Sequence, residues 1–345
     1  MNKIGIGLIG SGFMGRSSAE TVSRYLTSAR LVAITGGSRA QALATEYGVE
    51  ASPDLTTLLA RSDIDAVMIS TPHASHAAEA VAAAEAGKHV LLDKPMATNV
   101  ADCDRIISAA ERSGVKIMIM FGQRFRDCNV AAHRLVREGA IGRVRMIEER
   151  LLASGGLASL PPWQSLSENV GILVGHAVHN IDRIRWITGS EVSSVSAQVQ
   201  CDPASGNEVS TMALLSLEDG AMATLWASWD IAAPPFPRSA SGAWIAGTEG
   251  NLDLDAYGEL RLGKGDAWKV VATQAPIDWA GQGSLSPVRM EAYRRQHREF
   301  IDAILEDRIP AVTMHDGRAA VEVAVAAYQS ARLGKVIDLP LKETR

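Results

Sequence analysis

Residues 4–15 read I-G-I-G-L-I-G-S-G-F-M-G, an apolar run that ends in a glycine-rich turn. The glycines of this turn have the spacing G-x-G-x-x-G, which is informative when it follows a strand and opens a helix. In that setting the first glycine permits a tight turn, the second lets the backbone approach a pyrophosphate, and the third allows close packing of helix on strand. The free N–H groups at the start of the helix then favour phosphate. We therefore expect a dinucleotide to bind at Gly10, Ser11, Gly12, Phe13, Met14 and Gly15.

The sequence around this turn, up to about residue 120, alternates short apolar runs with alanine-rich segments. The segments 74–86 and 100–113 carry apolar residues at helical spacing. Apolar strands that alternate with helices predict a parallel sheet covered on both faces, and hence an α/β domain over residues 1–122. Its strands are expected at 4–9, 31–34, 66–69, 90–92 and 117–121.

The pattern changes after residue 143, where longer segments of alternating polarity are separated by Gly, Pro and Asp-Gly turns. These features predict an antiparallel sheet within an α+β domain that spans residues 123–345. The C-terminal helix, about 316–333, is a candidate to pack back on the first domain. Strands are expected at 143–153, 191–202, 208–217, 221–230, 243–248 and 251–255, and helices at 172–188, 288–306 and 316–333.

The composition is that of an ordinary globular protein of 345 residues, with 47% apolar and 21% charged residues. A net charge of −5 argues against nucleic acid or an anionic membrane as the main partner. No apolar stretch reaches the roughly 18 residues of a membrane span, and the N-terminus lacks the features of a signal peptide. Cys103, Cys128 and Cys201 form no C-x-x-C pair, which favours a cytoplasmic protein without a disulfide framework or a metal site.

The end of the second expected strand bears on the choice of cofactor. An Asp or Glu about 20 residues after the glycine turn normally binds the ribose of NAD. Residues 34–39 read I-T-G-G-S-R and contain no carboxylate. The hydroxyl of Ser38 and the guanidinium of Arg39 instead suit a phosphate monoester, so we favour NADP, with NAD as the alternative. The other interpretation of Arg39 is a solvated residue that opens the next helix.

Two polar segments follow the strands expected at 66–69 and 90–92, namely Ser70-Thr71-Pro72-His73 and Asp93-Lys94-Pro95. Ligands of an open parallel sheet bind beyond the carboxyl ends of its strands, so both segments are expected at the cofactor site. The proline restricts Lys94 and would aim its side chain. A partly desolvated lysine has a lowered pKa and exchanges protons near neutral pH, which makes Lys94 a candidate catalytic residue. The alternative is a strand-end lysine whose side chain only reaches out to solvent.

Several motifs together carry a resemblance to a known family. Asp93-Lys94-Pro95 is similar to a family motif E-K-P, with Asp in place of Glu. Further matches are T-P-x-x-x-H at 71–76, R-F at 124–125, G-x-I-G at 139–142, H-x-x-F-x-x-A-I at 297–304 and D-G at 316–317. On these residues the chain resembles, over nearly its whole length, the Gfo/Idh/MocA family of glucose–fructose oxidoreductase, inositol dehydrogenase and rhizopine-catabolism proteins.

The resemblance implies a Rossmann domain, then a domain with a large open-faced antiparallel sheet that pairs into a homodimer or homotetramer. It implies hydride transfer between a nicotinamide and a hydroxyl carbon of a sugar, cyclitol or sugar derivative, with Lys94 in the active site and a cis peptide bond before Pro95. Redox-assisted glycoside cleavage with a recycled cofactor, and a non-catalytic dinucleotide sensor, are the alternatives. The expected cofactor contacts beyond the glycine turn are Ser38, Arg39, Ser70, Thr71, Pro72, His73, His76, Asp93, Lys94 and Gln123.

The chain departs from the family on the helix expected at 172–188. His179 and Asp182 fit the family's H-x-x-D, but the family's preceding Asp is replaced by Gly175, and His176 is an addition. Two histidines three residues apart share a helix face and could act as base and orienting group, so both are candidate catalytic residues. The alternatives are half of a metal site, for which no third ligand is evident, or a histidine bonded to a backbone carbonyl.

The substrate site is expected in the second half of the chain, where all seven Trp residues lie between 163 and 279. Aromatic rings suit the C–H face of a carbohydrate, and Trp163 is close in sequence to the histidine helix. Most other Trp residues are expected in the core or at interfaces. Arg124 and Arg150 could contact polar groups of the substrate or form structural ion pairs. The candidate substrate contacts are Arg124, Trp163, His176, His179 and Asp182.

Overall fold

The computed structural model describes residues 3–156, 160–166, 169, 171–236, 238 and 240–342. The chain divides into two units, of which the first comprises residues 1–122 and 277–318 and the second comprises 123–276 and 319–345. Among the described residues, no helix has the length and apolar character needed to cross a bilayer.

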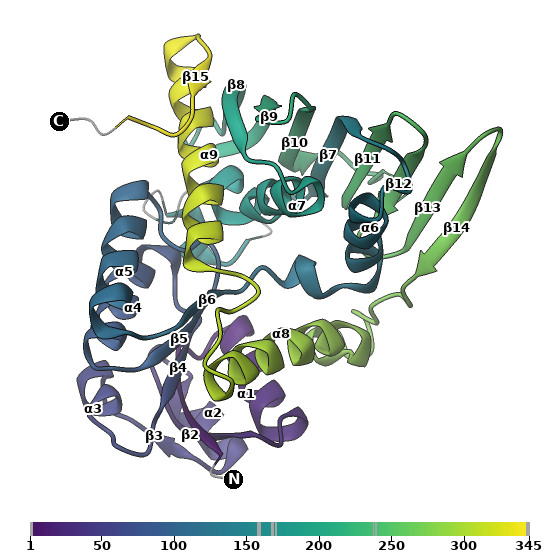
Figure 1. Ribbon diagram of the computed structural model, residues 1–345. Helices are drawn as coiled ribbons and strands as arrows, with labels where there is room; N and C mark the ends of the chain where they lie inside the picture. Colours follow the sequence, from purple (N-terminus) through teal and green to yellow (C-terminus); the bar gives the residue numbers. More distant parts are fainter. Residues whose placement is uncertain are drawn as a thin grey trace. The chain divides into compact units, whose positions relative to one another are not determined.

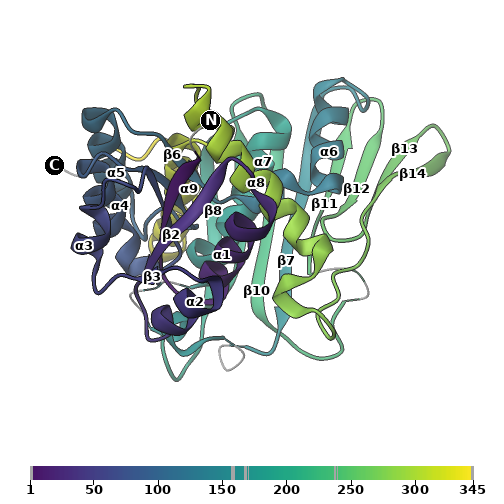
Figure 2. The same cartoon turned by 90° about the horizontal axis from the view of Figure 1, so that it is seen from below.

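The first unit contains a six-stranded sheet with the strand order β3-β2-β1-β4-β5-β6, in which every neighbouring pair is parallel. This confirms the predicted Rossmann fold. Helices α4 and α5 cover one face of the sheet, and α1 lies on the other (Figures 1 and 2). The strands are β1 (Ile4–Ile9), β2 (Ala29–Thr35), β3 (Glu50–Ala51), β4 (Ala66–Ile69), β5 (His89–Leu92) and β6 (Ile117–Ile119), and the helices are α1 (Phe13–Tyr25), α2 (Ala40–Tyr47), α3 (Leu55–Leu59), α4 (His76–Glu85) and α5 (Val100–Ser113).

The sheet register brings the ends of three strands to one level. Ile9 of β1 pairs with Ile69 of β4, which pairs with Leu92 of β5. The strand order reverses between β1 and β4, and this switch point is where such sheets bind ligands. The residues that follow these strands, Gly10, Ser70 and Asp93, are therefore neighbours at the predicted cofactor edge.

The compact units differ from the predicted domains at residues 277–318, which belong to the first unit. Helix α8 (Pro287–Leu305) in this segment packs against α1, where His297 Nε2 lies 3.1 Å from Ser18 Oγ. The first unit is thus completed by α8, whereas the C-terminal helix α9 (Met314–Leu333) belongs to the second unit from residue 319 onward. An amphipathic pattern shows that a helix has a buried face but does not show which core that face covers.

The second unit contains a nine-stranded sheet in the order β14-β13-β12-β11-β7-β10-β9-β8-β15. The predicted antiparallel sheet is confirmed except that β7 and β10 run parallel. Helices α6 (Asp127–Arg137) and α7 (Val178–Thr188) lie on the same face of it (Figure 1). The strands are β7 (Val144–Ser154), β8 (Val192–Cys201), β9 (Glu208–Leu217), β10 (Met222–Ile231), β11 (Ser241–Gly247), β12 (Asn251–Asp255), β13 (Glu259–Lys264), β14 (Ala267–Thr273) and β15 (Ile337–Asp338).

Sequence analysis did not predict β3, β13, β14 or β15. Strands β3 and β15 contain two residues each, too few to show a period. Residues 267–270 of β14 are all exposed and none of its seven residues is buried, so this strand has no buried face whose alternation could be recognised.

Candidate active site

The glycine turn after β1 leaves no room for other side chains at two positions. Gly10 has φ of +106°, and a Cβ atom there would lie 2.4 Å from the carbonyl oxygen of Ser70. A Cβ atom on Gly15 would lie 2.1 Å from the carbonyl oxygen of Gly10. These contacts hold the first turn of α1 against the ends of β1 and β4. Gly12 has no backbone atom this close, so its peptide remains open to a ligand at the helix start.

The loop after β2 faces the same turn. The Ser11 hydroxyl donates a 2.8 Å hydrogen bond to the Gly36 carbonyl. Nη2 of Arg39 would lie 3.7 Å from a Cβ atom on Gly12, so this exposed guanidinium reaches the glycine turn. In the described part of the chain, no carboxylate forms an ion pair with Arg39. The exposed Ser38 precedes it.

Histidine 76, at the start of α4, ties the two polar strand-end segments together. Its Nδ1 lies 2.7 Å from the Pro95 carbonyl oxygen and its Nε2 lies 3.0 Å from that of Thr71. The ring is fully buried, and burial lowers its pKa. His76 therefore holds the two loops together, and the contact with a cofactor stays a prediction. His73, also predicted at the cofactor, is buried with its ring centroid 5.8 Å from that of His76, whereas Pro72 is exposed.

Lys94 stands at the end of β5 beside a carboxylate. The Lys94 backbone N–H donates a 2.8 Å hydrogen bond to Asp93 Oδ1, and the Lys94–Pro95 peptide bond is cis. Burial raises the pKa of Asp93, against the opposing effect of the Lys94 charge. Burial also lowers the pKa of Lys94, with Asp93 opposing that shift. Lys94 as a whole keeps some exposed surface, and the lowered pKa brings its amine closer to exchanging a proton near neutral pH.

Glu79 of α4 was not among the predicted site residues, yet it contacts one of the polar strand-end segments. Thr71 Oγ1 donates a hydrogen bond to Glu79 Oε2. Burial raises the pKa of Glu79 to about 7, although the bond from Thr71 acts in the opposite direction. In the sequence Glu79 is one of several polar residues within an alanine-rich helix, and only the fold shows that it is half-buried.

The raised pKa of Glu79 predicts a loss of stability with rising pH. The unfolded chain releases this proton near 4.5, whereas the folded protein holds it up to about 7. The proton's contribution to the free energy of unfolding is therefore complete below the unfolded pKa. As the pH rises through the folded pKa, the free energy of unfolding falls by up to about 3 kcal/mol. Between about pH 4 and about pH 9, the free energy of unfolding in urea should fall by this much more in the wild type than in Glu79→Gln. Glu85→Gln, an exposed control on the same helix, should follow the wild type.

Arg124 and Asp182 in the second unit bind each other. Nε of Arg124 donates to Oδ2 of Asp182 at 2.9 Å, and Nη2 of Arg124 donates to Oδ1. The Asp182 carboxylate has no exposed surface. Asp182 therefore holds Arg124, and its contact with a substrate stays a prediction. Cζ of Arg124 also lies 5.8 Å from the centroid of the Trp186 ring. This contact holds Trp186 of α7 against the segment that precedes α6.

Gln123, a predicted cofactor contact, is buried within the second unit. Its Nε2 donates to the Tyr257 hydroxyl at 3.0 Å, and its Oε1 accepts from Asn129 Nδ2 at 2.8 Å. The amide group is occupied at both ends, so Gln123 serves to hold α6 and the loop after β12.

His176 and His179 lie on either side of a change in helix type. Residues Leu173–Ala177 form a π-helical turn, and α7 begins at Val178. A π turn has more residues than an α turn, so the spacing of three across this junction differs from the α-helical spacing on which the shared face was predicted. The His176 ring meets Trp229 of β10 edge-on, with centroids 5.0 Å apart. Both histidines are partly exposed.

The start of this helix contacts a carboxylate that the sequence did not reveal. Glu208 of β9 accepts hydrogen bonds from the Leu173 N–H at 3.1 Å and from the Tyr328 hydroxyl at 3.0 Å. A Cβ atom on Gly171 would lie 2.1 Å from Glu208 Oε2. A glycine before a helix can signal such a close approach, but it cannot identify a partner 37 residues away.

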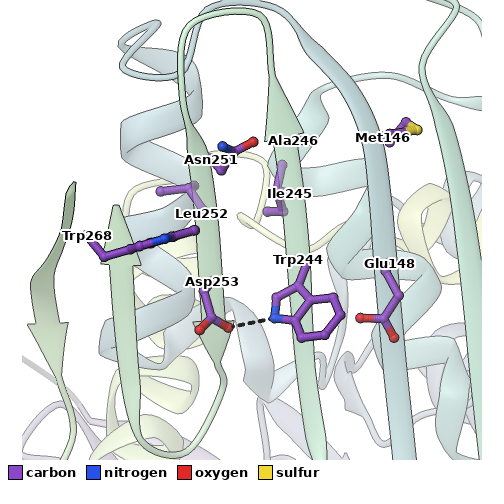
Figure 3. Close-up of a pocket in the computed structure, with 9 residues that line it drawn as sticks. All are labelled: Met146, Glu148, Trp244, Ile245, Ala246, Asn251, Leu252, Asp253 and Trp268. Carbon is purple, nitrogen blue, oxygen red and sulfur yellow. Dashed lines mark hydrogen bonds between the residues drawn. The ribbon is translucent and has the colours of Figure 1, made fainter. Parts of the chain in front are cut away.

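Trp163 lies in a short helical turn (Pro162–Ser165) and is partly exposed, with its carbonyl accepting a 2.9 Å bond from Asn169 Nδ2. Arg150 stacks 4.9 Å from the Trp244 ring and pairs with Glu148. Residues 148 and 244 line a pocket of about 510 Å³ over β7, β11 and β12, together with Asp253 and Trp268 (Figure 3). None of the predicted substrate contacts lines this pocket. Within the described ranges, no group of three His, Cys, Asp or Glu residues could hold a metal ion.

Comparison with known proteins agrees with both units. Residues 4–121 match the family described as "Oxidoreductase family, NAD-binding Rossmann fold", and residues 129–253 match the "GFO/IDH/MocA C-terminal domain". Inositol 2-dehydrogenase 3 of Saccharopolyspora erythraea is 25% identical over 98% of this chain and 96% of its own. A 2,7-anhydro-N-acetylneuraminate hydratase of Mediterraneibacter gnavus is 24% identical over 96% and 95%. The structure of levoglucosan dehydrogenase with NADH and L-sorbose has a TM-score of 0.84, 24% identity and coverage of 99% and 100%, a similarity of fold.

Proposed function

Because the chain belongs to the Gfo/Idh/MocA oxidoreductase family, we propose that it transfers a hydride between a nicotinamide dinucleotide and a hydroxyl carbon of a sugar, cyclitol or sugar derivative. The observation that carries this proposal is Lys94. This partly exposed residue has an amine whose pKa is lowered by burial, and it follows β5, the neighbour of β4, beyond the same edge of the sheet as the glycine turn. A proton-exchanging group at that edge is what oxidation of a hydroxyl requires.

The glycine turn would hold the pyrophosphate at the start of α1, with Ser11, Phe13 and Met14 beside it. The nicotinamide supplies the hydride acceptor when it is bound. Lys94 Nζ, in its neutral form, would take the proton of the substrate hydroxyl, and His179 would orient that hydroxyl or share its proton. We assign His176 and Trp163 to the substrate side of the second unit, where each keeps some exposed surface.

This proposal is tested by incubating the protein with NAD or NADP and a panel of sugars, cyclitols and sugar acids, while the absorbance of the reduced nicotinamide is followed. Turnover with a member of the panel supports the proposal. If the protein binds dinucleotide but reduces none of it with any member, dehydrogenation is not its reaction. Product analysis under the same conditions would then test the alternative, a conversion without net redox change. That alternative is favoured by Gly175 at the family's Asp position and by the similarity to a protein named as a hydratase.

For the cofactor we propose a preference for NADP over NAD. The support is Arg39, an exposed guanidinium at the glycine turn with no carboxylate partner among the residues described, on a loop that has no Asp or Glu at the ribose position. The names of several relatives point to NAD, for example a scyllo-inositol 2-dehydrogenase (NAD(+)) of Bacillus subtilis. A preference for NADP would therefore have to come from the loop after β2 of this chain, which carries Arg39.

Replacing Arg39 with alanine should raise the Kd for NADP by about tenfold or more and leave the Kd for NAD within about twofold. The reason is that a charge-assisted contact to a 2′-phosphate is lost and NAD has no such phosphate. Isothermal titration with both dinucleotides measures this difference. Arg16→Ala is a matched control, because Arg16 is an exposed arginine of α1 already paired with Glu46. Equal losses for both dinucleotides would contradict the assigned preference.

We also propose that the open face of the second sheet pairs with a second copy of the chain. Large apolar side chains on neighbouring strands are exposed on that face, which is unusual for a free surface. Light scattering on the purified protein would test this pairing. The exposed residues are Met146, Met212, Leu214, Met222, Trp226, Trp244 and Trp268.

A further inference from the structure

Arg289 of α8 is a buried cation beside the glycine turn, although it is separated from that turn by more than 270 residues of sequence. The residue is only 2% exposed. Its Nη1 donates to Ser17 Oγ at 2.9 Å and to the Ser284 carbonyl, and its Nη2 donates to the Tyr293 hydroxyl at 3.2 Å. These bonds fix the guanidinium against the first two turns of α1.

The guanidinium also contacts Phe13 and Met14, the two residues between Gly12 and Gly15. Its carbon Cζ lies 4.5 Å from the ring centroid of Phe13, and its Nη2 lies 3.5 Å from Sδ of Met14. The Tyr293 ring lies on it as well, at 4.4 Å. Phe13 and Met14 carry backbone N–H groups that open at the start of α1, so Arg289 controls how these groups are presented.

What is unusual about Arg289 is that no carboxylate among the described residues forms a direct ion pair with it, although its charge is close enough to oppose the rise that burial causes in the pKa of the Asp93 carboxyl. A buried charge is ordinarily paired with an opposite charge, because desolvation of an isolated ion costs too much. Among the residues described in the first unit, no carboxylate lies within ion-pair distance of this guanidinium. A cation that only fastened α8 to α1 would not need to be charged, since an apolar side chain of similar size packs as well.

We propose that Arg289 is a positioning residue for the dinucleotide, and that the phosphate anion of the cofactor completes its charge balance. The start of α1 already carries a partial positive charge, and Arg289 adds a full charge behind it in a medium of low dielectric. Because the guanidinium is buried, it acts through its field and through Phe13 and Met14 rather than by direct contact. This inference rests on the proposed dinucleotide binding and extends it to a helix outside the predicted Rossmann segment.

The test compares ligands with and without phosphate groups on matched variants. Arg289→Gln removes the charge, Arg289→Lys keeps it, and Arg298→Gln removes an exposed charge from the same helix as a control. Titration with ADP and with adenosine should show an approximately tenfold higher Kd for ADP in Arg289→Gln and a loss of at most about threefold in Arg289→Lys. Adenosine should bind all four proteins equally, because it carries no phosphate for the field to act on.

The outcomes separate this inference from the proposed function. If the wild type binds neither ADP nor a dinucleotide, both are overturned. If Arg289→Gln loses affinity for ADP and adenosine alike, or for neither, the inference alone is overturned. The role of Arg289 would then be limited to holding α8 against α1. Should the Gln variant fail to fold, Arg289→Lys decides the point: retained ADP affinity supports a role for the charge, and a tenfold loss excludes it.

Discussion

Lys94→Ala is expected to lower kcat about 10³-fold, while the Kd for the dinucleotide stays within about threefold of the wild type. General acid–base catalysis by a positioned side chain contributes about 10² to 10⁴ in rate, so its removal should show in kcat. The glycine turn, which would hold the pyrophosphate, does not include Lys94, so binding should survive. Rapid mixing and steady-state assays with the best substrate of the panel measure both quantities. Lys116→Ala is the matched control, because that ammonium is already paired with Asp307 at 2.7 Å.

The pH dependence gives a second readout of the same residue. In the direction of hydroxyl oxidation the neutral amine is the active form, so kcat/KM should rise as the pH passes the pKa of Lys94. Burial lowers that pKa below the ordinary value of 10.5, and the charge of Asp93 partly opposes the shift. Asp93→Asn removes the opposing charge, so the rise should move to lower pH. A rise that moves to higher pH, or a Lys94→Ala protein that keeps its rate, would place the proton transfer on another group.

The part of this site that lies at strand ends could be predicted from the sequence, because strand ends of a parallel sheet meet at one edge wherever the strands themselves are recognised. The glycine spacing and the run that ends in Asp93-Lys94-Pro95 both carry this local information. The residues that fix the site could not be predicted in the same way. Whether Asp182 faces a ligand or an arginine 58 positions earlier depends on tertiary packing, and the pattern of α7 alone permits either.

Dependence on tertiary packing also explains why the roles of several other residues could not be predicted from the sequence. His76 and Gln123 are predicted cofactor contacts, and only the fold shows that both are buried and hydrogen-bonded to neighbouring loops. Glu208 and Arg289 have no motif around them, and each becomes informative only when the fold shows that its charge is buried at a helix start. Buried charges of this kind are common near functional sites, because there the protein uses electrostatic strength that a solvated group would not have.

His179→Asn is expected to lower kcat about 10²-fold or more and to leave dinucleotide affinity unchanged. The residue belongs to the second unit, whereas every residue of the glycine turn belongs to the first, so loss of the imidazole should affect the substrate step alone. The Arg124–Asp182 ion pair is expected to keep α7 in place in the variant, since asparagine is close to histidine in size and lies one turn from that pair. Single-turnover kinetics and titration with the dinucleotide measure the two effects.

His176→Asn is the matched comparison, because it removes the neighbouring imidazole from the same segment. The His176 ring packs edge-on against Trp229, so its loss should cost mainly stability and KM, with a smaller effect on kcat than that of His179→Asn. The comparison is informative because His176 lies within the π turn at residues 173–177, whereas His179 lies in the α-helix that follows. If His176→Asn instead causes the larger loss of kcat, the added histidine has taken over the proton transfer, and Gly175 marks a site whose acid–base group has moved by one position along the chain.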